Sequence, residues 1–143
     1  MTGSELAFVD TNILIYCFDS SDTKKKNDAF LLIKKLISEK TLCFSNQILA
    51  EFAIVSTKKL KLDSETARKI IDDLFQAAHI YNYTEKTILS ALDISKKDNI
   101  SFWDALIVAT MLENKITIIY TENTKDFLKC KQISVINPCD AIH

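Results

Sequence analysis

The stretch Leu6-Ala7-Phe8-Val9-Asp10-Thr11-Asn12 decides how the remaining sequence is interpreted. Its four apolar residues predict a short buried strand, and the polar residues after them predict the start of a helix. A strand that ends on a carboxylate brings it to the edge of the sheet where open α/β folds bind their ligands. We therefore look for a site around Asp10.

Composition predicts a folded domain of ordinary size. The chain has 143 residues, of which 48% are hydrophobic and 26% charged, and we expect one domain spanning residues 1–143. The 18 basic and 19 acidic residues give a net charge of −1. This balance is not that of a protein that coats nucleic acid, but it is compatible with an enzyme that contacts a few phosphates.

Rare residue types exclude several kinds of site. The four cysteines and two histidines are not spaced as zinc ligands. The single glycine, Gly3, excludes a glycine-rich phosphate loop, so phosphate chemistry would need side chains and a metal ion. The chain has neither a leader sequence nor an apolar run of the roughly 18 residues that suggest a membrane span. We expect a soluble, cytoplasmic protein with reduced thiols.

Predicted strands alternate with predicted helices along the whole chain. Strands are expected at 6–9, 41–44, 79–83, 116–120 and 133–136. Residues 19–27 are expected to form a loop, although the lysines at 24–26 are expected to open the next helix. Ser45 or Asn46, Asp63 or Ser64, Thr84, and Ser101 are expected to cap helices, and Asn114 to end the last long one in a left-handed conformation. This alternation predicts an α/β fold with a parallel sheet and right-handed crossovers.

Acidic and amide side chains follow several of these strands or open helices. Asp10 ends the first strand, Glu51 lies about two turns into the helix after the second, and Asp104 lies in the first turn of the most apolar helix. Asn123 and Asp126 follow the fourth strand. We expect all five to lie at the same edge of the sheet.

Helical geometry places two of these acids toward the core. At about 100° per residue, Asp104 falls on the buried stripe of its helix and Glu51 at the border of the apolar face of its own. Buried acids are costly unless they are paired or bind metal, and the lysines cluster elsewhere. Converging carboxylates would raise one another's pKa values. A hard cation, Mg²⁺ or Mn²⁺, would remove that conflict.

Each of these residues also has a purely structural interpretation. Asp10 would suffice as a helix N-cap, Asp104 as part of a capping box with the serine three residues before it, and Glu51 as a half-buried acid with a hydroxyl or amide partner. Asn123 fits a turn and Asp126 a solvated position. Each alternative explains one residue, and none explains why all of them share an edge.

Five segments resemble the PIN-domain nucleases, and more narrowly the small single-domain toxins of bacterial and archaeal toxin–antitoxin pairs. These segments are residues 8–12, 45–51, 102–107, 121–127 and 135–138. The resemblance implies a three-layer α/β/α sandwich around a central parallel sheet. It also implies endonucleolytic cleavage of RNA that depends on Mg²⁺ or Mn²⁺, a cognate antitoxin partner, a homodimer and no membrane association.

The resemblance also implies roles for individual residues. Asp10, Glu51 and Asp104 match the three core catalytic and metal-binding acids. The fourth acidic position of the family holds Asn123 here, an amide that can still bind metal through its carbonyl oxygen, and Asp126 could substitute for the missing acid.

Three further residues match polar supports of that site. Asn12 and Ser45 resemble the supports of the first acid and the metal, and Thr121 matches the threonine that precedes the fourth acidic position.

Two other functions remain open from the sequence. A non-catalytic module that binds RNA or a partner helix is favoured by Asn123. A phosphotransfer enzyme with Asp10 as nucleophile would want a second aspartate where Asn12 stands. Several lysine clusters could contact RNA phosphates, but a solvated helix face explains each of them. Trp103 could stack on a base, but its position beside Phe102 favours packing in the core or in a dimer.

Overall fold

A five-stranded parallel sheet forms the centre of the computed structural model, which describes residues 5–140. The strands lie in the order β3-β2-β1-β4-β5, and each neighbouring pair is parallel. Their bounds are β1 Ala7–Val9, β2 Leu42–Ser45, β3 His79–Tyr81, β4 Ile118–Tyr120 and β5 Ser134–Ile136. The strand that ends on Asp10 is therefore the central one.

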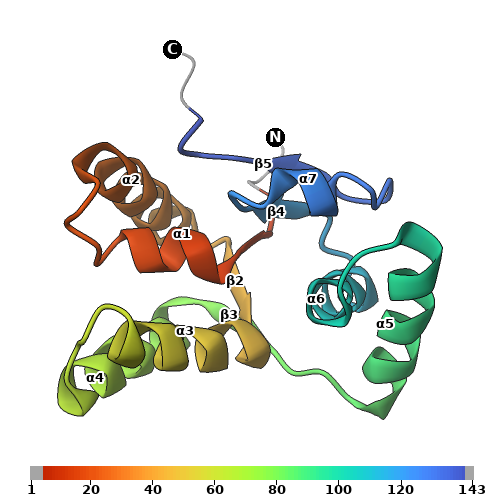
Figure 1. Cartoon of the computed structure of the whole chain (residues 1–143), viewed down its shortest axis with the longest axis horizontal. Helices are drawn as coiled ribbons and strands as arrows, with labels where there is room; N and C mark the ends of the chain where they lie inside the picture. The colour runs from red at the N-terminus through yellow and green to blue at the C-terminus, as the bar shows by residue number, and fades with distance from the viewer. Residues whose placement is uncertain (1–4, 141–143) are drawn as a thin grey trace.

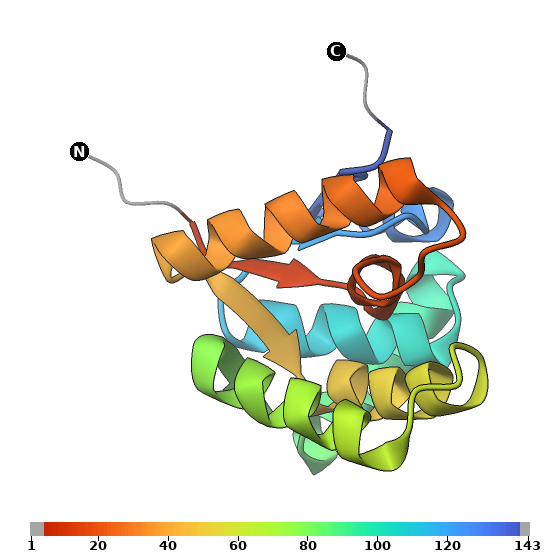
Figure 2. The same ribbon diagram turned by 90° about the vertical axis from the view of Figure 1, so that its left-hand side faces the viewer.

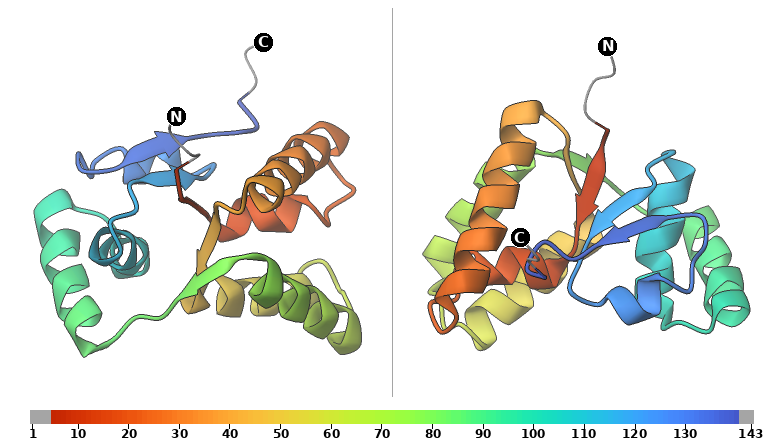
Figure 3. Two further views of the ribbon diagram at one scale, coloured as in Figure 1. Left: turned by 180° about the vertical axis from the view of Figure 1, so that it is seen from behind. Right: turned by 90° about the horizontal axis from the view of Figure 1, so that it is seen from above.

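Helices cover both faces of this sheet. They are α1 Thr11–Tyr16, α2 Thr23–Glu39, α3 Asn46–Lys58, α4 Ser64–Ala77, α5 Glu85–Asp98, α6 Phe102–Glu113 and α7 Thr124–Phe127. Figure 1 shows α1 to α4 on one side of the strands and α5 and α6 on the other. Figure 2, viewed from the first side, shows α2 and α4 in front of β1 and β2, and Figure 3 shows the two helical layers from behind and from above. The predicted α/β fold, with helices on both sides of a parallel sheet, is confirmed.

Side-chain oxygens cap most of the helices at their N-termini. Ser45 accepts from the backbone N–H of the third residue after it, as do Asp63 and Ser101, at 3.2, 2.7 and 3.2 Å. These caps agree with the sequence analysis. The first helix is capped by Asp10 rather than by the residues that follow it.

One helix begins a residue earlier than expected, and the expected left-handed end of another is wrong. Asp22 accepts from the backbone N–H of Lys25 at 3.1 Å and so starts α2 at Thr23, one residue before the lysines that were expected to open it. Asn114 has φ −106° instead of a left-handed conformation, because its Nδ2 donates to the carbonyl oxygen of Thr110 at 2.8 Å and holds it in the last turn. Lys115 takes the positive φ of 58° instead.

The core lies between the sheet and its helices. Strands β1 and β2 are buried along their whole length, and α6 is buried from Ala105 to Met111. This burial fixes β1, α3 and α6 relative to one another, so the polar residues at their ends have defined positions. Within residues 5–140, no helix is both long enough and apolar enough to cross a membrane.

Candidate active site

Asp10 is a buried carboxylate held by three donors. Its Oδ1 accepts from the backbone N–H of Thr11 at 2.8 Å, and its Oδ2 accepts from the hydroxyl of Thr121 at 2.8 Å and from Nδ2 of Asn12 at 3.5 Å. Burial raises its pKa more than the hydrogen bonds from Thr121 and Thr11 lower it. The N-cap role that the sequence offered as an alternative is thus present, but it uses only one of the two oxygens.

Glu51 faces the same space from α3. Its carboxyl is half-buried, and its pKa is raised by burial and then by the negative charges of Asp10 and Asp104. The side chains of Gln47 and Thr11 lower this pKa in part. Glu51 also lines the same cavity as Trp103, the residue before Asp104, so it lies on the side of α3 that faces the start of α6.

Asp104 completes the group from the first turn of α6. Its Oδ2 accepts a hydrogen bond from Nδ2 of Asn123 at 3.1 Å. Burial raises its pKa, followed by the charges of Asp10 and Asp126, against hydrogen bonds from Ser101 and Asn123. Asp10 and Asp104 are linked by hydrogen bonds through Thr121 and Asn123. With Glu51 in the same cavity lining as Trp103, the three acids lie around the same end of the sheet.

Within residues 5–140, no basic side chain forms an ion pair with this acidic group. Among the described residues, the ion pairs are Lys24–Asp28, Lys25–Glu122, Lys69–Asp73 and Lys129–Asp126. None of them involves Asp10, Glu51 or Asp104. Burial is the main cause of the raised pKa values of all three acids, and for Glu51 and Asp104 neighbouring carboxylates without a counter-charge raise them further.

The acids are neighbours, but they do not form a closed set of ligands. In the part of the chain that the structure describes, no three His, Cys, Asp or Glu side chains are gathered closely enough to hold one metal ion. The carboxylate oxygens of Asp10 and Asp104 instead accept hydrogen bonds from Thr121 and Asn123. The available donors are all oxygens, which is the chemistry that Mg²⁺ and Mn²⁺ prefer.

The two residues expected near the fourth acidic position differ in their contacts. Asn123 donates a hydrogen bond from its amide Nδ2 to Asp104. Asp126 lies in α7 and forms an ion pair with Lys129 at 3.6 Å. Asp126 still raises the pKa of Asp104, so it lies close to the group, but its charge is already partly balanced.

Thr121 joins the first strand to the fourth. Its buried hydroxyl donates to Asp10 and accepts from the backbone N–H of Asn123 at 3.0 Å and from Nδ2 of Asn12 at 3.3 Å. Ser45 plays a different part, because its oxygen accepts from the N–H of Ile48 and so caps the helix that carries Glu51. Its contribution to the site is therefore the placement of α3.

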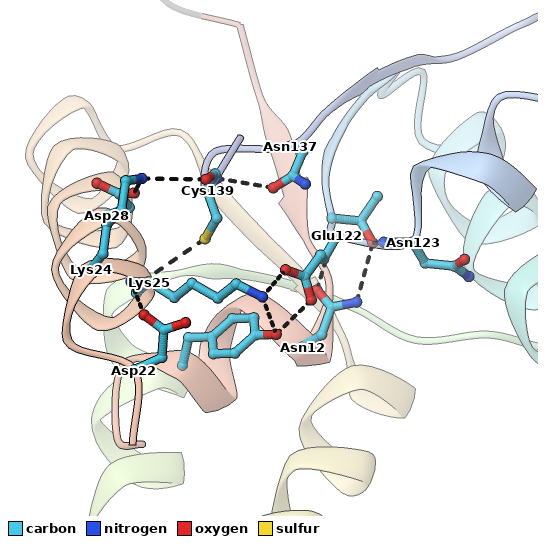
Figure 4. Close-up of polar contacts among 11 residues, drawn as sticks. Asn12, Asp22, Lys24, Lys25, Asp28, Glu122, Asn123, Asn137 and Cys139 are labelled. Atoms are coloured by element: carbon cyan, nitrogen blue, oxygen red, sulfur yellow. Dashed lines mark hydrogen bonds and ion pairs between the residues drawn. The ribbon is translucent and has the colours of Figure 1, made fainter. Parts of the chain in front are cut away.

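A polar network beside the site was not foreseen from the sequence. Figure 4 shows Lys25, Glu122 and Asn12 turned toward one another. Lys25 Nζ lies 2.6 Å from Oε2 of Glu122 and 3.2 Å from the hydroxyl of Tyr16, which donates to Oε1 of Glu122. Asn12 Oδ1 accepts from the backbone N–H of Glu122 at 3.2 Å. The network ties the segment after β4 to α1 and α2.

Only one part of this network, the spacing of Asn12 and Tyr16, could have been read from the sequence. Burial raises the pKa of Glu122, but hydrogen bonds from Lys25 and Tyr16 outweigh it and leave the pKa lowered. Tyr16 follows Asn12 by four residues, so both lie on one face of α1. No pattern in the sequence links Lys25 to either of them.

Comparison with known proteins assigns the chain to a family. The model of the PIN domain family matches residues 7–132. No curated protein matches the chain by sequence comparison. Among solved structures, a toxin–antitoxin complex from Klebsiella pneumoniae has a chain with 22% identity and a TM-score of 0.67, covering 92% of this chain and 97% of its own.

Two further structures are similar over almost the whole chain. One, described as FitAB bound to a DNA fragment, has 18% identity and a TM-score of 0.73, and the match covers 96% of this chain and 99% of that one. The other is Mycobacterium tuberculosis VapC20, described as a toxin that cleaves the sarcin–ricin loop, with 18% identity, a TM-score of 0.67 and coverage of 87% and 95%. At this identity the likeness shows the fold, and the family match goes further: the chain belongs to the PIN domain family.

Proposed function

We propose that this protein is an endoribonuclease that depends on Mg²⁺ or Mn²⁺. The observation that carries the proposal is the placement of Asp10, Glu51 and Asp104, three acids from three elements, around one end of the sheet, with no ion pair to any of them from residues 5–140. Membership of the PIN domain family supports the same conclusion. Neighbouring carboxylates without a counter-charge favour the binding of a hard cation.

The residues of the site would have two roles, binding the cation and orienting its ligands. Asp10, Glu51 and Asp104 would hold the cation, with the carbonyl oxygen of Asn123 and the carboxylate of Asp126 as further donors. When bound, such a cation lowers the pKa of a coordinated water and balances the charge of the phosphate. Thr121 and the backbone N–H of Thr11 hold the carboxylate of Asp10 in one orientation. The carboxylate therefore would not need to reorient when a cation binds.

We further propose that the chain is the toxin of a toxin–antitoxin pair, with an antitoxin protein as partner and a homodimer as the working assembly. The similar structures named above include a toxin–antitoxin complex and a toxin described as cleaving the sarcin–ricin loop. Co-purification with the product of an adjacent small gene tests the partner, and sedimentation of the purified chain tests the dimer.

Cleavage of RNA by the purified chain tests the activity. We expect cleavage with Mg²⁺ or Mn²⁺, none in excess EDTA, and none from Asp104→Asn with either ion. Asp72→Asn is a matched control because this aspartate is exposed on α4, away from the site. Equal cleavage with and without EDTA would overturn the metal-dependent mechanism.

A non-catalytic role is the second candidate, and Asn123 favours it. An amide stands where the resemblance implies a fourth acid, and it is engaged with Asp104. A module of this kind would bind RNA and would not cut it in the presence of any divalent metal ion. Retention of labelled RNA together with intact RNA after prolonged incubation with Mn²⁺ would favour this alternative.

A further inference from the structure

A cavity of about 340 Å³ opens beside the acidic group. Its walls are formed by one face of α3, the first turn of α6 and the segment between β3 and α5, through residues Gln47, Ala50, Glu51, Ile54, Tyr83 and Trp103. Glu51 belongs both to this cavity and to the proposed metal site. Trp103 directly precedes Asp104 in the sequence. The cavity therefore adjoins the proposed site of cleavage at Glu51.

Trp103 does not pack in the core, which corrects one of the two structural interpretations given above. It is 58% exposed, and Ile54 across the cavity is 56% exposed. The backbone at Trp103 is nevertheless fixed, because the buried amide of Gln47 donates from Nε2 to its carbonyl oxygen at 3.0 Å. The ring also meets Phe102 edge to face, with centroids 5.5 Å apart. A large aromatic surface is thus held in place and left open.

The chemistry of the walls limits what the cavity can bind. No lysine or arginine lines it, and Glu51 contributes a carboxylate, so a phosphate would be repelled. Trp103 and Tyr83 offer aromatic rings, and Ile54 and Ala50 offer apolar surface. An uncharged, planar, aromatic group fits these walls, since bases stack on such rings whatever their identity.

We propose that this cavity binds a nucleobase of the RNA adjacent to the scissile phosphate, stacked on Trp103. The inference rests on the proposed nuclease function and adds a base-binding subsite to it. Glu51 then separates the base from the phosphate that is cut. Stacking also explains how a chain with a net charge of −1 gains affinity for RNA without a strongly basic surface.

The fluorescence of Trp103 tests the subsite directly, because it is the single tryptophan of the chain. Adenosine, titrated without metal, should quench this fluorescence saturably, and ribose should not. Because adenosine carries no phosphate and is not cleaved, this result is independent of nuclease activity. Equal and unsaturable effects of adenosine and ribose would overturn the proposal.

Kinetic variants provide a second test that separates binding from chemistry. Trp103→Ala should raise KM for RNA about 5- to 150-fold, the range expected for loss of one stacked base, while kcat changes little. Trp103→Phe should restore most of the affinity. Phe75→Ala is the matched control, an exposed aromatic on α4, and should leave KM unchanged. An unchanged KM in Trp103→Ala would overturn the subsite.

Two further outcomes separate the base-binding proposal from the proposed nuclease activity and from a dimer contact at Trp103. If adenosine quenches Trp103 but the chain cleaves no RNA with Mg²⁺ or Mn²⁺, the nuclease proposal fails while base binding stands. If the fluorescence of Trp103 changes with protein concentration, and Trp103→Ala dissociates a dimer in sedimentation, a second copy of the chain covers the cavity. That result would overturn the base-binding assignment.

Discussion

Asn123 donates a hydrogen bond from its Nδ2 to Oδ2 of Asp104 at 3.1 Å. This contact places a neutral donor beside an acid whose pKa is raised by burial and by its acidic neighbours. A carboxylate at position 123 would instead add a further negative charge to a group that has no basic partner. The amide therefore reduces the repulsion within the site when no cation is present.

Asn123→Asp should make the protein more dependent on a cation. Without metal, the new carboxylate loses the hydrogen bond and repels Asp104, so we expect a loss of about 1–3 kcal/mol in the free energy of unfolding. With Mg²⁺ in excess, the added ligand should return most of that stability through linkage. Urea denaturation in EDTA and in Mg²⁺ measures both values. Asn123→Ala, which removes the amide without adding charge, should respond to Mg²⁺ less than Asn123→Asp, and equal responses would contradict this account.

Thr121→Val should destabilise the protein by about 1–3 kcal/mol, because it leaves the buried carboxylate of Asp10 without one of its donors. The change keeps the shape of the side chain and removes only the hydroxyl. Thr121→Ser, which keeps the donor, should cost less. A double-mutant cycle with Asp10→Asn should show coupling between the two positions, and simple additivity would mean that the hydrogen bond contributes nothing.

The acids predict a specific dependence of stability on pH. Asp104 has an ordinary pKa of 3.8, which burial and its neighbours raise, so the folded state holds this proton more tightly than the unfolded chain does. Its contribution to stability is complete below the ordinary pKa and is lost as the pH rises through the raised value. In EDTA, Asp104→Asn should therefore gain stability relative to the wild type as the pH rises from the ordinary pKa of 3.8 toward neutrality. Thermal melts across this range measure the difference, and a constant difference would contradict the raised pKa.

The sequence predicted the layout of the fold because its signals are local. The apolar strand before Asp10 and the capping oxygens of Ser45, Asp63 and Ser101 each depend on a few neighbouring residues, and the structure confirms them. The start of α2 lies one residue before the lysines expected to open it, and its cap, Asp22, had been assigned to the preceding loop.

The site was only partly accessible from the sequence. Asp10, Glu51 and Asp104 could be grouped because the ends of parallel strands meet at one edge. The network of Lys25, Glu122 and Tyr16 could not be foreseen, because no periodic pattern links Glu122 to Tyr16, which lies 106 positions earlier in the sequence. The exposure of Trp103 was missed for another reason: it lies on the first turn of the most apolar helix, where sequence favours burial.

Binding of Mn²⁺, followed by the loss of its free-ion paramagnetic resonance signal, tests the central claim most directly. The account predicts saturable binding to the wild type and to Asp72→Asn, and loss of binding in Asp10→Asn, Glu51→Gln and Asp104→Asn, with all five proteins folded by circular dichroism. Mn²⁺ binding that is unchanged in the three site variants, or absent from the wild type, would contradict the claim that these carboxylates together form a cation site.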